Sequence, residues 1–235
     1  MAGAEHSSKQ FDHDLEGLRS VVMAMGGLVE SQIKDAIEGL YLGKLEVLEQ
    51  VIANDFKVDR LQLEVDESCA QIIARRQPTA GDLRMILGVS KIVTDLERVG
   101  DKARKIARLA RALNNGQKID MVWKVDIKRL GERAAALLSR SLDAFARADV
   151  PAAIDVIKQN HAVGRESAAI ESALIKAMME QPQSVTTVLD MMAATKAFDR
   201  VGDHATNICE QLIYILKGTD VRHATLEQIE REALR

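Results

Sequence analysis

The 235-residue sequence is poor in aromatic residues, proline and cysteine, and each shortage argues against a class of protein. Aromatic residues make up only 3% of the chain, so a surface that stacks nucleic-acid bases is not expected. Only three prolines occur, which leaves room for long unbroken helices. Cys69 and Cys209 lack both CxxC spacing and a Cys/His cluster. We therefore expect two buried, unreactive thiols rather than a zinc site.

Several catalytic and membrane signatures are also missing. The chain has no ExxH pair of the ferritin-like di-iron type, no Walker A string and no GxSxG motif. No apolar run approaches the roughly 20 residues of a membrane-spanning helix, and the polar first ten residues lack the apolar region of a signal peptide. The net charge of −3 gives no reason to expect nucleic acid or an anionic membrane as a partner. We expect a cytoplasmic protein.

Apolar residues recur every three or four positions over long stretches, which predicts amphipathic helices. The predicted helices cover residues 11–42, 45–76, 79–113, 122–147, 150–181 and 184–216. Turn and capping signals separate them, among them Gly43, Pro78, Asp149 and Pro182. Because the connections are short, sequential helices should be antiparallel neighbours.

One five-residue pattern occurs twice and indicates an internal duplication. The first copy is Glu97-Arg98-Val99-Gly100-Asp101, and the second is Asp199-Arg200-Val201-Gly202-Asp203. We therefore predict an all-α fold of two tandem antiparallel three-helix bundles with six long helices. The bundles should span residues 1–117 and 118–218, and the tail 219–235 should leave the bundle as a short or frayed helix.

The two acids of each motif lie four positions apart and thus on one side of their helix. On a helical wheel Gly100 falls in the buried stripe, and Glu97 and Asp101 border it. Like charges this close destabilise a helix, so a cation should neutralise them. Paired carboxylates in a bundle suit Mg²⁺, Mn²⁺ or iron. Glu97, Asp101, Asp199 and Asp203 are therefore the predicted metal ligands.

Internal ion pairs are the competing explanation. In the first motif Arg104 and Lys105 follow Asp101 at the third and fourth positions, where they can neutralise it without a metal. Thr206 and Asn207 take those places in the second motif, which makes the second motif the stronger metal candidate.

Three further polar residues are candidates for a role near the motifs. Asp55 and Asp59 also lie four positions apart, and they are less certain ligands that could complete a site from a facing helix. His204 adjoins Asp203 but projects to the opposite flank of the helix, and we interpret it as a surface histidine.

Four groups of residues together resemble the PhoU family of cytoplasmic regulators. They are Arg76-Gln77-Pro78 followed by Asp82-Leu83-Arg84, the two acidic motifs, the continuation Asp203-His204-Ala205-Thr206-Asn207-Ile208, and the closing Gly218 to His223. The resemblance implies two three-helix bundles that bind iron, zinc, manganese or magnesium at the acidic motifs. It also implies a non-enzymatic negative regulator of phosphate uptake and of the phosphate-starvation response.

The partners implied by this resemblance are the ATPase subunit of the phosphate ABC transporter and the phosphate-sensing histidine kinase. A homodimer is implied as well, with the membrane reached only through these partners. Lys102 departs from the family's histidine after the first motif, and Asn160 and Gly164 stand where Asp55 and Asp59 would be repeated. Two alternatives remain: a metal-dependent enzyme that activates water at Asp199 and Asp203, and a helical scaffold whose acids are merely solvated.

Overall fold

The computed structural model describes residues 2–114 and 121–233, and the side chains of residues 13–114 and 123–233. Within these ranges the chain forms seven α-helices, one short 3-10 turn and no strand. The elements are α1 (Ala2–Leu42), α2 (Leu45–Arg76), α3 (Ala80–Asn114), α4 (Met121–Arg147), α5 (Val150–Glu180), η1 (Pro182–Ser184), α6 (Val185–Lys217) and α7 (Leu226–Ala233). The six predicted long helices are therefore confirmed.

Only α1 differs clearly from its predicted bounds, because it begins at Ala2 instead of residue 11. The first ten residues carry no apolar period, so a periodicity search does not detect a helix there. A helix that is already nucleated by packing extends at little cost through residues that tolerate it.

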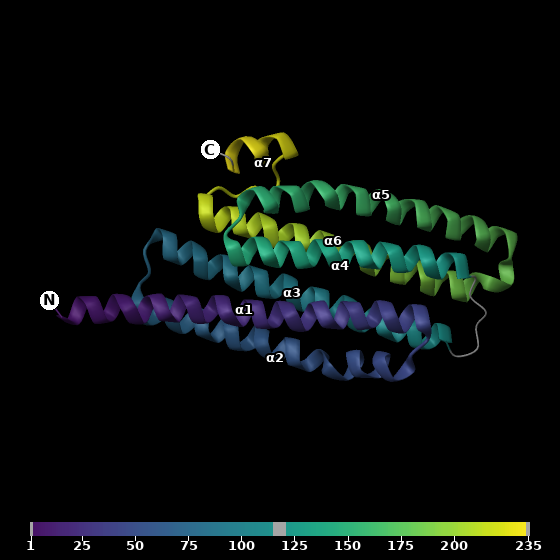
Figure 1. The fold of residues 1–235 in the computed structure, drawn as a ribbon, viewed down its shortest axis with the longest axis horizontal. Coiled ribbons are helices and arrows are strands. Elements are labelled where there is room, and N and C mark those ends of the chain that lie inside the picture. The colour runs from purple at the N-terminus through teal and green to yellow at the C-terminus, as the bar shows by residue number, and fades with distance from the viewer. Residues whose placement is uncertain (1, 115–120, 234–235) are drawn as a thin grey trace.

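The six long helices form two three-helix units that pack side by side (Figure 1). Helix α3 packs on α6 and α1 packs on α4, so these four helices form the centre of the molecule, while α2 and α5 lie on its outer sides. Buried residues of both units belong to one continuous hydrophobic cluster. The two predicted bundles thus share a core, and the predicted boundary between residues 117 and 118 falls outside the described residues.

Helices α3 and α6 run antiparallel where the two repeats meet (Figure 1). Gly88, early in α3, packs against Ile215 near the end of α6, whereas Asp95 further along α3 contacts His204. The middle of each helix, at Val99 and Val201, is completely buried. An antiparallel pair of equivalent helices is the arrangement of a pseudo-twofold axis, so the repeats are related by rotation and not by translation.

The helix ends follow the signals in the sequence. Asp149 caps α5 by accepting a hydrogen bond from the Ala152 N–H at 2.9 Å. Gly218 ends α6 in the left-handed conformation, with φ of 76°, and its N–H donates to the Tyr214 carbonyl at 2.9 Å. Glycine adopts this conformation without the steric cost that a Cβ would add.

The tail does not leave the bundle as predicted. Its short helix α7 packs on α5, with Ile229 and Ala233 buried, and Val221 is buried ahead of it. An ion pair joins Glu230 of α7 to Lys158 of α5. The apolar face of α7 had no partner visible in sequence, and the side of α5 supplies one.

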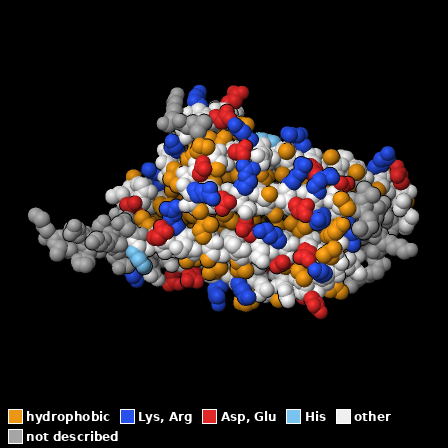
Figure 2. All heavy atoms as spheres, viewed as in Figure 1, with side chains coloured by type: hydrophobic (Ala, Val, Ile, Leu, Met, Phe, Trp, Pro, Cys, Tyr) orange, Lys and Arg blue, Asp and Glu red, His pale blue; other side chains and the backbone are white. Residues whose placement is uncertain are grey.

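The mixed charge of the surface and the burial of both cysteines agree with what the composition predicts. Figure 2 shows acidic and basic side chains intermixed over one face, with hydrophobic groups between them. Cys69 and Cys209 are both buried, as predicted, and burial raises the pKa of the Cys69 thiol to about 11. In the part of the chain that the structure describes, no helix is long and apolar enough to span a membrane.

Candidate functional site

The first acidic motif lies on α3 and faces α2, where a partly buried ion-pair cluster joins the two helices. Arg104 of α3 donates to the Asp101 carboxylate, one turn earlier, at 2.5 Å, and to the Asp55 carboxylate of α2. The side chain of Asp55 is only 5% exposed. The guanidinium therefore occupies the space between the two carboxylates, which is the internal neutralisation that the spacing of Asp101 and Arg104 allowed.

The surrounding acids share one negative field. Burial raises the pKa of Asp55, Arg104 opposes the rise, and the charges of Asp59 and Asp101 add to it. Burial likewise raises the pKa of Glu97, and the charge of Asp101 raises it further. The structure thus brings Asp55, Asp59, Glu97 and Asp101 close enough to interact, with Arg104 as the cation among them.

Gly100 permits this close packing. A Cβ there would lie 3.3 Å from Val58 Cγ1 of α2 and 3.6 Å from Gln32 Oε1 of α1. Gln32 is 4% exposed, and neither polar atom of its amide has a partner in the described structure. The glycine on the buried stripe therefore allows a close approach between helices.

The second acidic motif lies on α6 and faces α5 with a different set of groups. Asn160 of α5 donates from Nδ2 to Asp203 Oδ1 at 3.2 Å, and Arg200 donates from Nη1 to Asp203 Oδ2 at 3.0 Å. Asn160 also lies directly against Gly202. The side-chain oxygen Oδ1 of Asn160 is buried and has no hydrogen-bond partner in the described structure.

Asp199, the other acid of the second motif, makes no ion pair with the side chains that the structure describes. Burial raises the pKa of Asp199, and the charge of Asp203 raises it further. Arg200 opposes this rise, and Glu171 of α5 adds to it. A Cβ on Gly164 of α5 would lie 3.8 Å from Asp199 Oδ1, so that helix supplies no ligand at this position.

The two motifs differ in how well they suit a metal ion. At the first, Arg104 already lies between the carboxylates, so the residues present do not fit an added cation in this arrangement. At the second, Asp199 and Asp203 present carboxylate oxygens, while the Asn160 side chain turns its amide nitrogen toward Asp203 and its oxygen toward Gly202. Within the described residues no three Asp, Glu, His or Cys side chains are grouped to hold a metal. The second motif thus fits only a hard cation that keeps much of its water, such as Mg²⁺ or Mn²⁺.

A polar cluster between the repeats was missed by sequence reasoning. His204 is not a surface histidine: its side chain is 16% exposed, and Nδ1 lies 2.8 Å from Asp95 Oδ1 of α3. Asn207 donates to the same carboxylate oxygen at 2.8 Å. Glu210 lies one turn further along α6, where burial raises its pKa to about 7 and the charge of Asp95 adds to the rise. Asp95 lies outside the repeated motif, so nothing in the sequence linked it to α6.

Comparison with known proteins places this architecture in a family. The model of the PhoU domain matches residues 22–110 and, a second time, residues 127–212. The chain belongs to the PhoU family. The two matches coincide with the two halves of the structure and account for the repeated motif.

Relatives in the PhoU family extend over nearly the whole chain. A Burkholderia sp. protein named phosphate-specific transport system accessory protein PhoU homolog is 40% identical over 98% of both chains. The Escherichia coli K12 protein of that system is 37% identical over 97% of this chain and 93% of its own length. The crystal structure of PhoU from Pseudomonas aeruginosa superposes with a TM-score of 0.86 at 40% identity, over 89% of this chain and 100% of that one.

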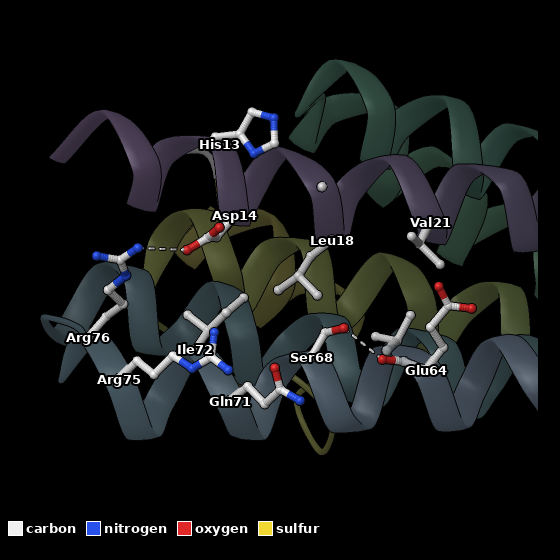
Figure 3. Close-up of a pocket in the computed structure, with 12 residues that line it drawn as sticks. His13, Asp14, Leu18, Val21, Glu64, Ser68, Gln71, Ile72, Arg75 and Arg76 are labelled. Atoms are coloured by element: carbon white, nitrogen blue, oxygen red, sulfur yellow. Dashed lines mark hydrogen bonds and ion pairs between the residues drawn. The ribbon is translucent and has the colours of Figure 1, made fainter. Parts of the chain in front are cut away.

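A further hollow in this PhoU-family chain lies away from both motifs. Figure 3 shows it between the first half of α1 and the last turns of α2, with Leu18 and Ile72 among its lining residues. Its volume is about 320 Å³, and Arg76 reaches across it to Asp14 at 3.4 Å. Arg76 belongs to the Arg76-Gln77-Pro78 string, so part of that string holds α2 to α1.

Proposed function

We propose that this chain is a non-enzymatic accessory protein of the phosphate-specific transport system. The observation that carries this proposal is the near full-length match to proteins named for that role, at 37–40% identity. The shared fold supports it. The proposal includes negative regulation of phosphate uptake and of the phosphate-starvation response.

The charge and shape of the surface suit an adaptor between other proteins. We infer that the chain acts in the cytoplasm as a homodimer between the ATPase subunit of a phosphate ABC transporter and a phosphate-sensing histidine kinase. Its long helices, packed on one shared core, present extended faces of mixed charge, which suit contacts with other proteins (Figure 2). No geometric observation favours the metal-dependent enzyme over this adaptor.

Deleting the gene tests the regulatory role. In rich phosphate we expect the deletion strain to express phosphate-starvation genes several-fold above the parent, measured by transcript quantification. A plasmid copy of the gene should restore repression. Repression that persists in rich phosphate without the gene would contradict the regulatory proposal, whatever the chain binds in vitro.

The second motif is the proposed metal site, with Asp199 and Asp203 as its ligands and water completing the coordination. A bound divalent cation would supply positive charge that neutralises the two carboxylates. Burial and then the charge of Asp203 raise the pKa of Asp199, and the cation would oppose both effects by stabilising the ionised carboxylates. Glu97 and Asp101 are the weaker proposed ligands because Arg104 already pairs with Asp101 and Arg98 lies 3.5 Å from Glu97.

Metal content and Mn²⁺ titration test this site. For protein purified without an affinity tag, we expect the double change Asp199→Asn and Asp203→Asn to weaken Mn²⁺ binding at least tenfold by calorimetry, because both charged donors are lost. The matched pair Glu97→Gln and Asp101→Asn should change binding less than twofold. Mass spectrometry reports any metal retained on purification. Equal binding by both double variants would rule out the second motif as the site.

A further inference from the structure

A groove of about 500 Å³ crosses the contact between α3 and α6, on the pseudo-twofold axis. It is lined by Arg98 and Lys102 of α3 and by Arg200, Asp203, His204, Thr206 and Asn207 of α6. Arg98 and Arg200 are equivalent residues of the two repeats, and so are Lys102 and His204. The duplication therefore brings basic side chains into one groove from both sides.

Arg200 pairs with Asp203 at 3.0 Å, but its side chain is 66% exposed, and the two basic groups of α3 are only loosely engaged. Arg98 is 3.5 Å from Glu97 and 3.9 Å from Asp101, and its side chain is 56% exposed. Lys102, half-buried, has no ion-pair partner among the described residues. Exposed ion pairs at such distances contribute little, so a ligand can recruit these cations at small cost.

Neutral donors complete the lining and are more rigid. Asp95 holds both His204 and Asn207 at 2.8 Å and so fixes their positions beside the groove. The Thr206 hydroxyl is buried and lacks a hydrogen-bond partner in the described structure. The groove thus presents arginine, lysine, amide and hydroxyl donors, a combination that suits an oxyanion.

We infer that this groove binds inorganic phosphate, a tetrahedral oxyanion that still carries a proton at neutral pH. The lining holds a single carboxylate, Asp203, among its donors. A protonated phosphate oxygen can donate to that carboxylate, whereas sulfate of the same shape has no proton at neutral pH and would be repelled by it. Asp203 therefore favours phosphate over sulfate.

This inference goes beyond the accessory role and does not rest on it. It assigns a ligand to residues on the α3 side of α6, whereas the proposed cation site lies on the α5 side. Asp203 borders both, so the test uses metal-free protein throughout. A failure here leaves the regulatory proposal untouched, because that proposal is tested by gene deletion.

The experiment is calorimetric titration of the full chain, freed of metal by chelator and dialysis, at pH 7 and constant ionic strength. Inorganic phosphate, O-phosphoserine and sulfate are the probes. We expect phosphate to bind more tightly than sulfate, and Lys102→Gln or Arg200→Gln to weaken phosphate about tenfold through loss of a charged hydrogen bond. Lys57→Gln, an exposed change on α2, should have no effect. Circular dichroism confirms that each variant folds.

The Asp203→Asn variant provides the sharper readout. This variant should bind sulfate as tightly as it binds phosphate, because the amide that replaces the Asp203 carboxylate can donate a hydrogen bond to either anion, whereas the carboxylate repels sulfate. O-phosphoserine should bind more weakly than inorganic phosphate, because its phosphoryl group is largely unprotonated at pH 7, and the reverse order would contradict the role given to Asp203. Phosphate binding no stronger than sulfate in the unaltered chain, or equal loss in the Lys57 variant, would overturn the inference.

Discussion

Replacing Arg104 with methionine is expected to lower the free energy of unfolding by about 3 kcal/mol at neutral pH. Methionine keeps the length of the side chain but removes its charge, so the nearly buried Asp55 carboxylate keeps only the weaker influence of Arg108 against the charges of Asp59 and Asp101. Removing one partner of a buried pair costs far more than removing an exposed one, because the remaining charge has lost its solvation. Urea unfolding followed by circular dichroism measures the loss.

The second repeat supplies the compensating change for this variant. Asn160 and Thr206 stand where the first repeat has Asp55 and Arg104, so Asp55→Asn with Arg104→Thr copies a pair that the same fold already accepts. We expect this double variant to recover most of the lost stability. Arg200→Met is the matched control and should cost under about 0.5 kcal/mol, since Arg200 is largely exposed. A loss for Arg104→Met as small as the control would show that Asp55 does not depend on Arg104.

Replacing Glu210 with glutamine is expected to stabilise the protein by about 2 kcal/mol at pH 8 and to have little effect at pH 5. Burial, then the charge of Asp95, raises the pKa of Glu210 to about 7 from an ordinary value of 4.5, with Asp220 adding to the rise and Arg222 opposing it. The folded state therefore binds the Glu210 proton more tightly than the unfolded state does. Between about pH 4.5 and 7 the protein loses stability as pH rises, because the Glu210 carboxyl is ionised in the unfolded chain but still largely protonated in the folded one.

Glutamine removes that pH dependence because it cannot ionise, so the difference between variant and parent should grow from about pH 4.5 to 7 and level off above pH 7. Denaturant unfolding at several pH values from 5 to 8 measures it. Glu227→Gln, an exposed change in α7, is the control and should give a flat difference of a few tenths of a kcal/mol. A flat difference for Glu210→Gln would mean that Glu210 ionises normally in the folded protein.

Local signals predicted most of the fold. The three-and-four spacing of apolar residues placed the six long helices, and Asp149 and Pro182 marked where two of them begin. The start of α1 was not predictable in the same way, because its first ten residues have no apolar stripe. These features depend on residues within one or two helical turns of each other, which is the range that a sequence pattern reports.

The candidate site was predictable only in part, for the same reason. The spacing of Asp101 and Arg104 allowed an internal ion pair, but the link from Arg104 to Asp55 crosses between helices and carries no sequence signal. The contact between Asp95 and His204 likewise joins the two repeats, so His204, predicted to lie on the surface, is an interface residue.

The sequence by itself determined the all-helical class, the duplication, the PhoU resemblance and the two acid pairs beside buried stripes. These follow from periodicity and repetition, which are properties of the chain read in order. Only the tertiary structure decided which cation meets each acid, that the repeats share one core about a pseudo-twofold axis, and that α7 docks on α5. Those outcomes depend on burial and charge between residues far apart in the chain, where the free energy is set by packing and not by local order.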